Sequence, residues 1–148
     1  MTALNRQLVR NRAREIRDSL EKIQRYTALT DAEFFADERN LYTVMHLLLI
    51  AIEAVTALCN HILAKKAGEA PSSYAECFAG MRDLKLLDDA LAARLVRMAR
   101  FRNLLVHRYW EIDPTQVLRF AREDLGDFTA YLQVVATLVG DEEINATT

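Results

Sequence analysis

The chain has 148 residues, of which 51% are hydrophobic and 27% are charged, and its formal net charge is −2. These values fit one globular domain, 1–148, that is long enough to bury a real core, and the net charge alone says nothing about nucleic acid. Two prolines and four glycines are few for this length, which predicts an all-α fold. Arginines interrupt any apolar run near the N-terminus, so we expect no signal peptide and a cytoplasmic location: Arg6, Arg10, Arg12, Arg14 and Arg17.

Two cysteines and one apolar run further narrow the class of protein. Cys59 and Cys77 do not make a disulfide framework or a metal knuckle, and we expect both to be reduced core residues. The most apolar run, 45–63, carries Glu53, Asn60 and two histidines. We therefore expect a buried helix there, not a membrane span.

The first half of the chain predicts two long helices with a short one between them. The first covers about 3–28, and its apolar face repeats every seven residues, at Val9, Ile16 and Ile23. Thr30 followed by Glu33 is a capping box that opens the short helix. The second long helix covers 38–66 and ends before Gly68, and it is apolar over much of its circumference, which predicts a central position.

The second half begins with another short helix. Ser73 and Glu76 form a second capping box, which predicts a short helix through Gly80. A third long helix is expected to start after Asp88 or the residue that follows, and to run to about Tyr109.

The fourth long helix begins at a proline. Asp113 followed by Pro114 is an N-cap with proline in the first turn, and this helix is expected to run to Gly140. The polar residues 141–148 are expected to be frayed. Four long helices with short connections predict an antiparallel four-helix bundle with short extra helices.

Charge is unevenly distributed along the second half. Residues 90–110 contain five arginines and no acid, whereas 111–148 contain eight acids and two arginines. This pattern is typical either of a polarised surface or of ordinary solvated helix faces, and charge alone leaves both interpretations open.

Arg102 occupies a position where a bundle would be expected to have leucine. It belongs to a stripe with steps of four and three residues, formed by Leu91, Leu95, Met98, Arg102, Leu105 and Tyr109. A guanidinium cannot lose its charge there, so it needs a compensating partner. A salt bridge to Glu53, a water-filled cleft and an anionic ligand all satisfy this requirement.

His107 points in a different direction from Arg102 on an ideal helix. It lies five residues further on, which corresponds to about 140° around the axis. Arg102 and Tyr109 share one face, and Asn103 and His107 share another. Either the end of the helix distorts near His107, or a second copy of the chain completes the site in a two-fold dimer.

An arginine, a histidine and a tyrosine without an acidic neighbour suit phosphate chemistry. Histidine takes and gives protons near neutral pH, and arginine holds a phosphate with two hydrogen bonds. If the substrate is RNA, its own 2′-hydroxyl can act as the nucleophile and no metal is needed.

The stretch Arg102-Asn103-Leu104-Leu105-Val106-His107-Arg108-Tyr109 matches the R-N-x-x-x-H-x-Y signature of HEPN-domain proteins. With its context, MARFRNLLVHRYWEID, it resembles the HepT-like toxin branch of that family. The resemblance extends to ERNLYTVMHLLLIAIEAVTALCNHIL, PSSYAECF and LKLLDD, and covers about 8–135. An arginine and a histidine at this spacing are a weak signal alone, whereas Arg-Asn, His-x-Tyr and these flanks together are specific.

The resemblance implies an all-α homodimer in which the motifs of both subunits line a shared cleft. It implies a metal-independent endoribonuclease, without a cofactor, that acts as the toxin of a bacterial or archaeal toxin–antitoxin pair. The implied partner is a minimal nucleotidyltransferase, which neutralises the toxin by transferring AMP to the motif tyrosine, here Tyr109.

The expected site residues have distinct roles. His107 acts as general acid or base and Arg102 binds the scissile phosphate, while Asn103 and Tyr109 support them. Further arginines are expected to follow the RNA backbone: Arg94, Arg97, Arg100 and Arg108. The alternative is a non-catalytic helical module that presents Arg102 and His107 to a nucleotide or to a partner nucleotidyltransferase.

Other polar and aromatic residues are expected to be structural. His46 and His61 lie too far apart along one helix to share a metal, so we expect ordinary bundle histidines. Trp110 is expected to pack beside the motif. Four tyrosines are expected in interhelical packing: Tyr26, Tyr42, Tyr74 and Tyr131.

Overall fold

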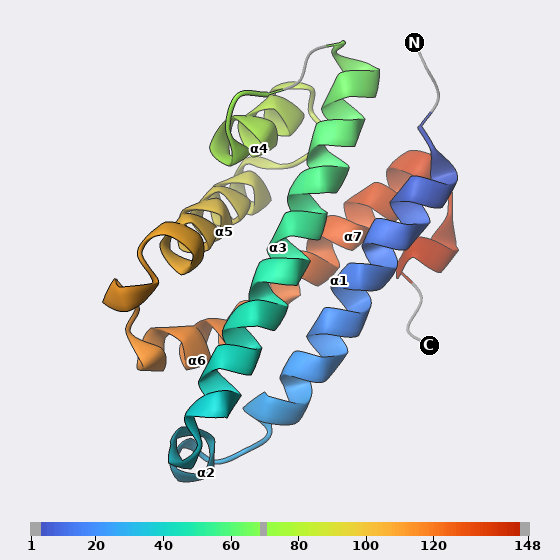
Figure 1. The fold of residues 1–148 in the computed structure, drawn as a ribbon. Helices are drawn as coiled ribbons and strands as arrows, with labels where there is room; N and C mark the ends of the chain where they lie inside the picture. Colours follow the sequence, from blue (N-terminus) through green and yellow to red (C-terminus); the bar gives the residue numbers. More distant parts are fainter. Residues whose placement is uncertain (1–3, 69–70, 146–148) are drawn as a thin grey trace.

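A computed structural model describes residues 4–68 and 71–145 of the chain. Within these ranges the fold consists of seven α-helices and two 3-10 turns, without a strand (Figure 1). The all-α prediction is confirmed.

The N-terminal half forms α1 (Arg6–Thr27), α2 (Asp31–Ala36) and α3 (Glu38–Lys66). α1 and α3 lie side by side over most of their lengths (Figure 1). The predicted apolar face of α1 is buried between them, including Val9, Ile16 and Ile23. The capping box of Thr30 and Glu33 is present with both hydrogen bonds, which fixes the start of α2.

The long helix α3 is central, because every other α-helix packs against it. Its length and apolar composition would also suit a membrane span, but 61% of its most apolar window is buried inside the protein. The core therefore accounts for the apolar character of this helix, as the polar residues within the run predicted.

The second half continues with α4 (Tyr74–Asp83) and α5 (Asp89–His107), which pack on each other and on α3. Ser73 caps α4 by accepting a hydrogen bond from the Glu76 amide at 3.1 Å. Asp88 caps α5 by accepting one from the Leu91 amide at 2.7 Å. Both starts agree with the capping residues in the sequence. The predicted capping box of Ser73 and Glu76 is incomplete, because the Glu76 side chain accepts from the Ser72 amide and not from the Ser73 amide.

The predicted fourth long helix is wrong, because two helices replace it. α6 (Pro114–Glu123) packs on α1 and α3, and α7 (Gly126–Val139) packs on α5, α1 and α3 (Figure 1). The break lies at Asp124 and Leu125, directly before Gly126, which is a weak helix former. The apolar spacing continues across the break, so periodicity alone did not reveal it.

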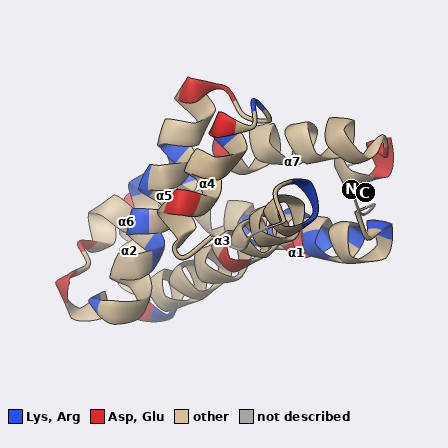
Figure 2. Ribbon diagram, turned by 90° about the horizontal axis from the view of Figure 1, so that it is seen from above, with Lys and Arg blue, Asp and Glu red and all other residues tan. Residues whose placement is uncertain are grey.

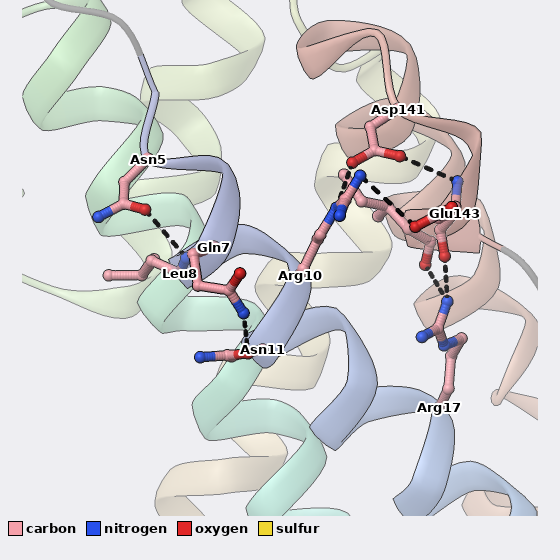
Figure 3. A network of polar contacts seen from close by, with 9 residues as sticks. Asn5, Gln7, Leu8, Arg10, Asn11, Arg17, Asp141 and Glu143 are labelled. Carbon is pink, nitrogen blue, oxygen red and sulfur yellow. Dashed lines mark hydrogen bonds and ion pairs between the residues drawn. The ribbon is translucent and has the colours of Figure 1, made fainter.

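The expectation of a frayed C-terminus is also wrong for the residues that the structure describes. Residues Glu142–Asn145 form a 3-10 turn, η2, and Ile144 is buried. Arg10 of α1 donates from Nε to Asp141 at 2.6 Å, and Arg17 donates to the carbonyls of Glu143 and Ile144 at 2.5 and 2.8 Å (Figure 3). Residues 146–148 lie outside the described part.

This C-terminal clamp, formed by Arg10, Arg17 and residues 141–145, depends on opposite charges from the two ends of the chain. Figure 2 shows basic positions along α1 and acidic ones in the nearby C-terminal turn. The Arg10 guanidinium holds the pKa of the Asp141 carboxyl below its usual range, mainly through their hydrogen bond. The polar tail therefore docks on α1 because Arg10 pairs with the carboxylates of Asp141 and Glu143. Arg17 adds hydrogen bonds to backbone carbonyls of the tail.

Cys59 and Cys77 are both fully buried, as expected, but the structure joins them in a disulfide between α3 and α4. The expectation of two separate reduced thiols is therefore wrong. Their Cα atoms are 6.0 Å apart, a separation that a disulfide spans. The pairing follows from the packing of α4 on α3, which a spacing of 18 residues does not reveal.

Candidate functional site

Arg102 lies on the inner face of α5, in line with the buried residues Leu91, Leu95, Met98 and Leu105. Its side chain is only 16% exposed, so the predicted conflict between a fixed charge and the core is real. The conflict is resolved across the helices, because Nε of Arg102 donates to Oε1 of Glu53 on α3 at 2.5 Å.

Glu53 also receives a hydrogen bond from a third helix. The hydroxyl of Tyr74, the first residue of α4, donates to Oε2 of Glu53 at 3.1 Å. The guanidinium carbon of Arg102 lies 4.6 Å from the centroid of the Tyr74 ring, at cation–π distance. Burial, and then the charge of Glu53, raise the pKa of Tyr74, so this hydroxyl stays protonated and able to donate.

These contacts fix the orientation of Arg102 but do not use all of its donors. A guanidinium has five N–H groups. Nε is bound to Glu53, and Nη1 donates to Oδ1 of Asn103 at 3.3 Å. The predicted salt bridge is confirmed, and among residues 4–68 and 71–145 neither Nη2 nor the second hydrogen of Nη1 has a hydrogen-bond partner, so both can bind an anion.

Asn103 contacts Arg102 in the structure. Its side-chain oxygen accepts the hydrogen bond from Arg102, so its amide nitrogen keeps both of its hydrogens free to donate. Asn103 therefore supports Arg102 directly, and no hydrogen bond joins it to His107 among the described residues.

His107 is the last residue of α5, and it is exposed. The helix ends there because Arg108 adopts φ −139° and ψ 38°, so the prediction of a helix to Tyr109 is wrong. Residues Tyr109–Glu111 form a separate 3-10 turn, η1, held by an Arg108–Glu111 ion pair at 2.5 Å. Tyr109 therefore does not share a helix face with Arg102, and that prediction is wrong.

The helix end distorts one residue too late to turn His107 toward Arg102. Both residues lie on regular helix, five positions apart, which keeps them about 140° apart around the axis. The polar partners of Arg102 in the described chain are Glu53 and Asn103. One chain therefore presents Arg102 and His107 without bringing them together.

Tyr109 and Trp110 form the most exposed aromatic pair beside the motif. Their side chains are 63% and 68% exposed, and their rings meet edge to face with centroids 5.3 Å apart. Trp110 contacts the motif residue Tyr109, as expected, but the rest of its side chain is exposed to solvent. Val106, one residue before His107, is also exposed, so three large hydrophobic residues near the end of α5 face solvent.

The four arginines expected on RNA differ in their surroundings. Arg94 pairs with Asp127 of α7 at 2.7 Å, and Arg108 pairs with Glu111. Arg97 lies close enough to Asp124 to oppose the rise in its pKa, which burial and then the charges of Asp127 and Glu123 cause. Acids of α7 and of the α6–α7 junction thus offset the basic face of α5, and Arg100 lines a cavity between α3, α4 and α5.

The histidines of α3 carry no metal-binding pattern. Nε2 of His61 accepts a hydrogen bond from the Asn5 amide at 3.0 Å, which ties α3 to the start of α1 and confirms a structural role. Burial and the nearby Lys65 lower the pKa of His61, which favours the neutral ring that accepts this bond. His46 is exposed, and residues 4–68 and 71–145 contain no cluster of three potential metal ligands.

Sequence reasoning missed Tyr74 as a site residue. It was expected to pack between helices, as Tyr131 does in the core against Phe78. The capping box placed Tyr74 at the start of α4 but gave no signal that it faces Arg102. Tyr42 is largely exposed, so the expectation of interhelical packing is wrong for that residue.

Comparisons with known proteins agree with this architecture. The family model "Ribonuclease HepT-like" matches residues 16–135. The chain is 25% identical over 147 residues to the tRNA nuclease HepT of Aphanizomenon flos-aquae, covering 98% of this chain and 99% of that protein.

Two solved structures share the fold. One is a tri-AMPylated HEPN toxin of Shewanella oneidensis in complex with MNT antitoxin, with a TM-score of 0.81, 24% identity, and 88% and 97% of the two chains covered. The other is the cytosolic protein YutE of Bacillus subtilis, of unknown function, with a TM-score of 0.71, 16% identity, and 100% and 99% covered. With the family model spanning most of its length, this chain belongs to the Ribonuclease HepT-like family of HEPN proteins.

Proposed function

We propose that this protein is a metal-independent endoribonuclease that acts as the toxin of a toxin–antitoxin pair. The observation that carries the proposal is Arg102, a nearly buried guanidinium held by Glu53 and Tyr74 with donors still free. Membership of the Ribonuclease HepT-like family and an intact motif through His107 and Tyr109 support it. The curated relative is named a tRNA nuclease, which makes tRNA the first substrate to test.

The proposed reaction is an internal transfer within RNA. His107 takes the proton of a 2′-hydroxyl, and the resulting 2′-oxygen attacks the adjacent phosphorus. The bond between phosphorus and the 5′-oxygen breaks, and a protonated histidine donates a proton to the leaving 5′-oxygen. The products are a 2′,3′-cyclic phosphate and a 5′-hydroxyl, and no metal takes part. Arg102 binds the phosphate through its free Nη edge and stabilises the charge that develops in the transition state.

The active form is proposed to be a homodimer. Arg102 and His107 of one chain diverge, and a two-fold axis near the end of α5 unites the two motifs in one cleft. The exposed side chains of Val106, Tyr109 and Trp110 lie where such a partner would cover them.

Regulation is proposed to occur at Tyr109. A minimal nucleotidyltransferase transfers AMP to the hydroxyl of this exposed residue. The added bulk blocks the binding of RNA, and the added phosphate pairs with Arg102. The fold relative from Shewanella, a tri-AMPylated toxin with its MNT antitoxin bound, supports this assignment. Intact mass after co-expression should increase by one or more AMP units, and the increase should disappear in Tyr109→Phe.

RNA cleavage in EDTA tests the central proposal. Purified wild-type protein should degrade RNA, whereas Arg102→Ala and His107→Ala, prepared identically, should not. Equal degradation by all three would identify a contaminant, and no degradation by any would exclude the nuclease.

The Glu53–Arg102 pair also favours a second candidate, the non-catalytic module, because an internal carboxylate already balances the arginine. In that case the wild-type protein would bind a nucleotide or a nucleotidyltransferase without cutting RNA. Expression of the chain alone would then leave growth unaffected, whereas the toxin should arrest it.

A further inference from the structure

A cavity of about 290 Å³ lies beside Arg102 where α3, α4 and α5 meet. Two of its lining residues, Tyr74 and Asn103, are the same side chains that contact Arg102. The cavity is therefore adjacent to the guanidinium proposed to hold the scissile phosphate.

Most polar side chains around this cavity keep a hydrogen-bond donor free. The exceptions are the hydroxyls of Ser72 and Tyr74, which already donate to Glu76 and Glu53. Arg100 is exposed and contributes a full positive charge, and Asn60 contributes a second amide. The Oδ1 atom of Asn103 accepts from Arg102, which leaves the amide hydrogens of Asn103 to donate. Ser73 accepts from the backbone of α4, so its hydroxyl hydrogen remains free. No carboxylate stands among the described residues that line the cavity, which selects an anionic ligand.

The remaining walls are small and apolar. Pro71, Ala75 and Ala99 line the cavity, and Ala99 belongs to the core. Small side chains leave room for a flat or ring-shaped group, while the donors at the edge suit phosphate and ribose oxygens. This combination of one cation, two amides and an apolar wall matches a nucleotide.

The geometry points to a binding pocket for the RNA nucleotide next to the scissile phosphate, with its own phosphate on Arg100 and its sugar or base against Ala75 and Ala99. This inference rests on the proposed nuclease function and names the part of the substrate that the site recognises. It also separates Arg100 from Arg94, Arg97 and Arg108, which lie outside the cavity. Asn103 then links the two positions, because it touches Arg102 and lines the pocket.

Two substitutions in the full-length protein test the pocket. Arg100→Gln removes its charge, and Ala75→Trp fills it without a change of charge. Arg100→Gln loses one charge-assisted contact, and Ala75→Trp excludes the nucleotide from the pocket. We expect each to raise KM for RNA cleavage about tenfold and to leave kcat within about twofold. Matched controls at exposed positions away from the pocket, Arg25→Gln and Ala32→Trp, should leave both constants unchanged.

A binding measurement separates the pocket from the nuclease. A fluorescent 2′-fluoro RNA oligonucleotide, which lacks the attacking hydroxyl, should bind about tenfold more weakly to both pocket variants by anisotropy. Weaker binding without cleavage by any preparation would support the pocket and overturn the nuclease. Arg102-dependent cleavage with unchanged KM and affinity in both variants would overturn the pocket alone. An effect of Arg100→Gln without one of Ala75→Trp would also overturn it, because Arg100 would then contact RNA outside the cavity. Circular dichroism shows whether Ala75→Trp is folded. If it is not, Asn60→Ala, an exposed change in the same pocket, takes its place in the comparison with Arg100→Gln.

Discussion

Two arginine–carboxylate pairs in this protein are built in opposite ways. In the site, Arg102 is 16% exposed and its partner Glu53 is 39% exposed. In the C-terminal clamp, Arg10 is 42% exposed and its partner Asp141 is only 6% exposed. The buried charge is thus a guanidinium in the first pair and a carboxylate in the second.

The difference decides which pair can still bind something. Both oxygens of Asp141 are engaged, one by Arg10 at 2.6 Å and the other by the Glu143 amide at 3.1 Å. Arg102 keeps free N–H groups after binding Glu53 and Asn103. The clamp therefore holds the tail in place, whereas the site holds an arginine ready for an anion.

Removal of the two arginines should have the most divergent effects. Arg102→Ala should lower kcat for RNA cleavage on the order of 10³-fold, because it removes the charge that stabilises the transition state. Arg102→Lys should not restore activity, since a lysine cannot bridge Glu53 and a phosphate in the same geometry. Arg10→Ala should leave kcat within about twofold and lower only the melting temperature. Equal loss of activity in Arg10→Ala and Arg102→Ala would contradict a catalytic role specific to Arg102.

Replacement of the two acids should show a smaller contrast. Glu53→Gln should lower kcat about tenfold or more, because a neutral amide holds the guanidinium less firmly in its reactive orientation. Tyr74→Phe, which removes only the hydrogen bond to Glu53, should have a weaker effect of the same kind. Asp141→Asn is the matched control and should leave kcat unchanged. If Glu53→Gln lost activity only because part of the protein is unfolded, its folded fraction would keep the wild-type kcat. That result would argue against a positioning role for Glu53.

Truncation of an apolar side chain should lower the free energy of unfolding more in the clamp than beside the site. Ile144 is buried under the clamp, so Ile144→Ala should lower the free energy of unfolding by about 2 kcal/mol. Val106, beside His107, is exposed, and Val106→Ala should change it by less than about 0.5 kcal/mol in the monomer. Urea titrations of both variants provide the measurement, and a loss in Ile144→Ala as small as the one expected for Val106→Ala would mean that burial of Ile144 does not stabilise the fold.

The pH dependence of the clamp should be the smallest effect. The pKa of Asp141 lies below its usual value of about 3.8 because of Arg10, so the pair stabilises the fold fully above that value. The contribution is lost as the pH falls through the lower folded-state pKa. The difference in stability between wild type and Asp141→Asn should therefore be present at pH 7, persist at pH 5 and shrink below pH 4. A difference that grows on acidification would have the wrong sign.

Capping residues in the sequence predicted where helices begin. The capping residues Thr30, Ser73, Asp88 and Asp113 start helices where expected, because each satisfies amide groups within its own turn. Apolar periodicity, in contrast, did not predict where two of the helices end. The break before Gly126 and the end of α5 at His107 both interrupt an apolar pattern that continues in the sequence.

The position of Arg102 on the inner face of a helix was determined by the sequence itself, since the spacing of its apolar neighbours places it in their stripe. The motif through His107 and Tyr109 was equally visible there. Only the tertiary structure decided the partners: Tyr74 over the guanidinium, the cavity of Arg100 and Asn103, the Cys59–Cys77 disulfide and the docked tail. Each of these contacts joins segments from different helices, and their geometry depends on how the helices pack, which no local pattern encodes.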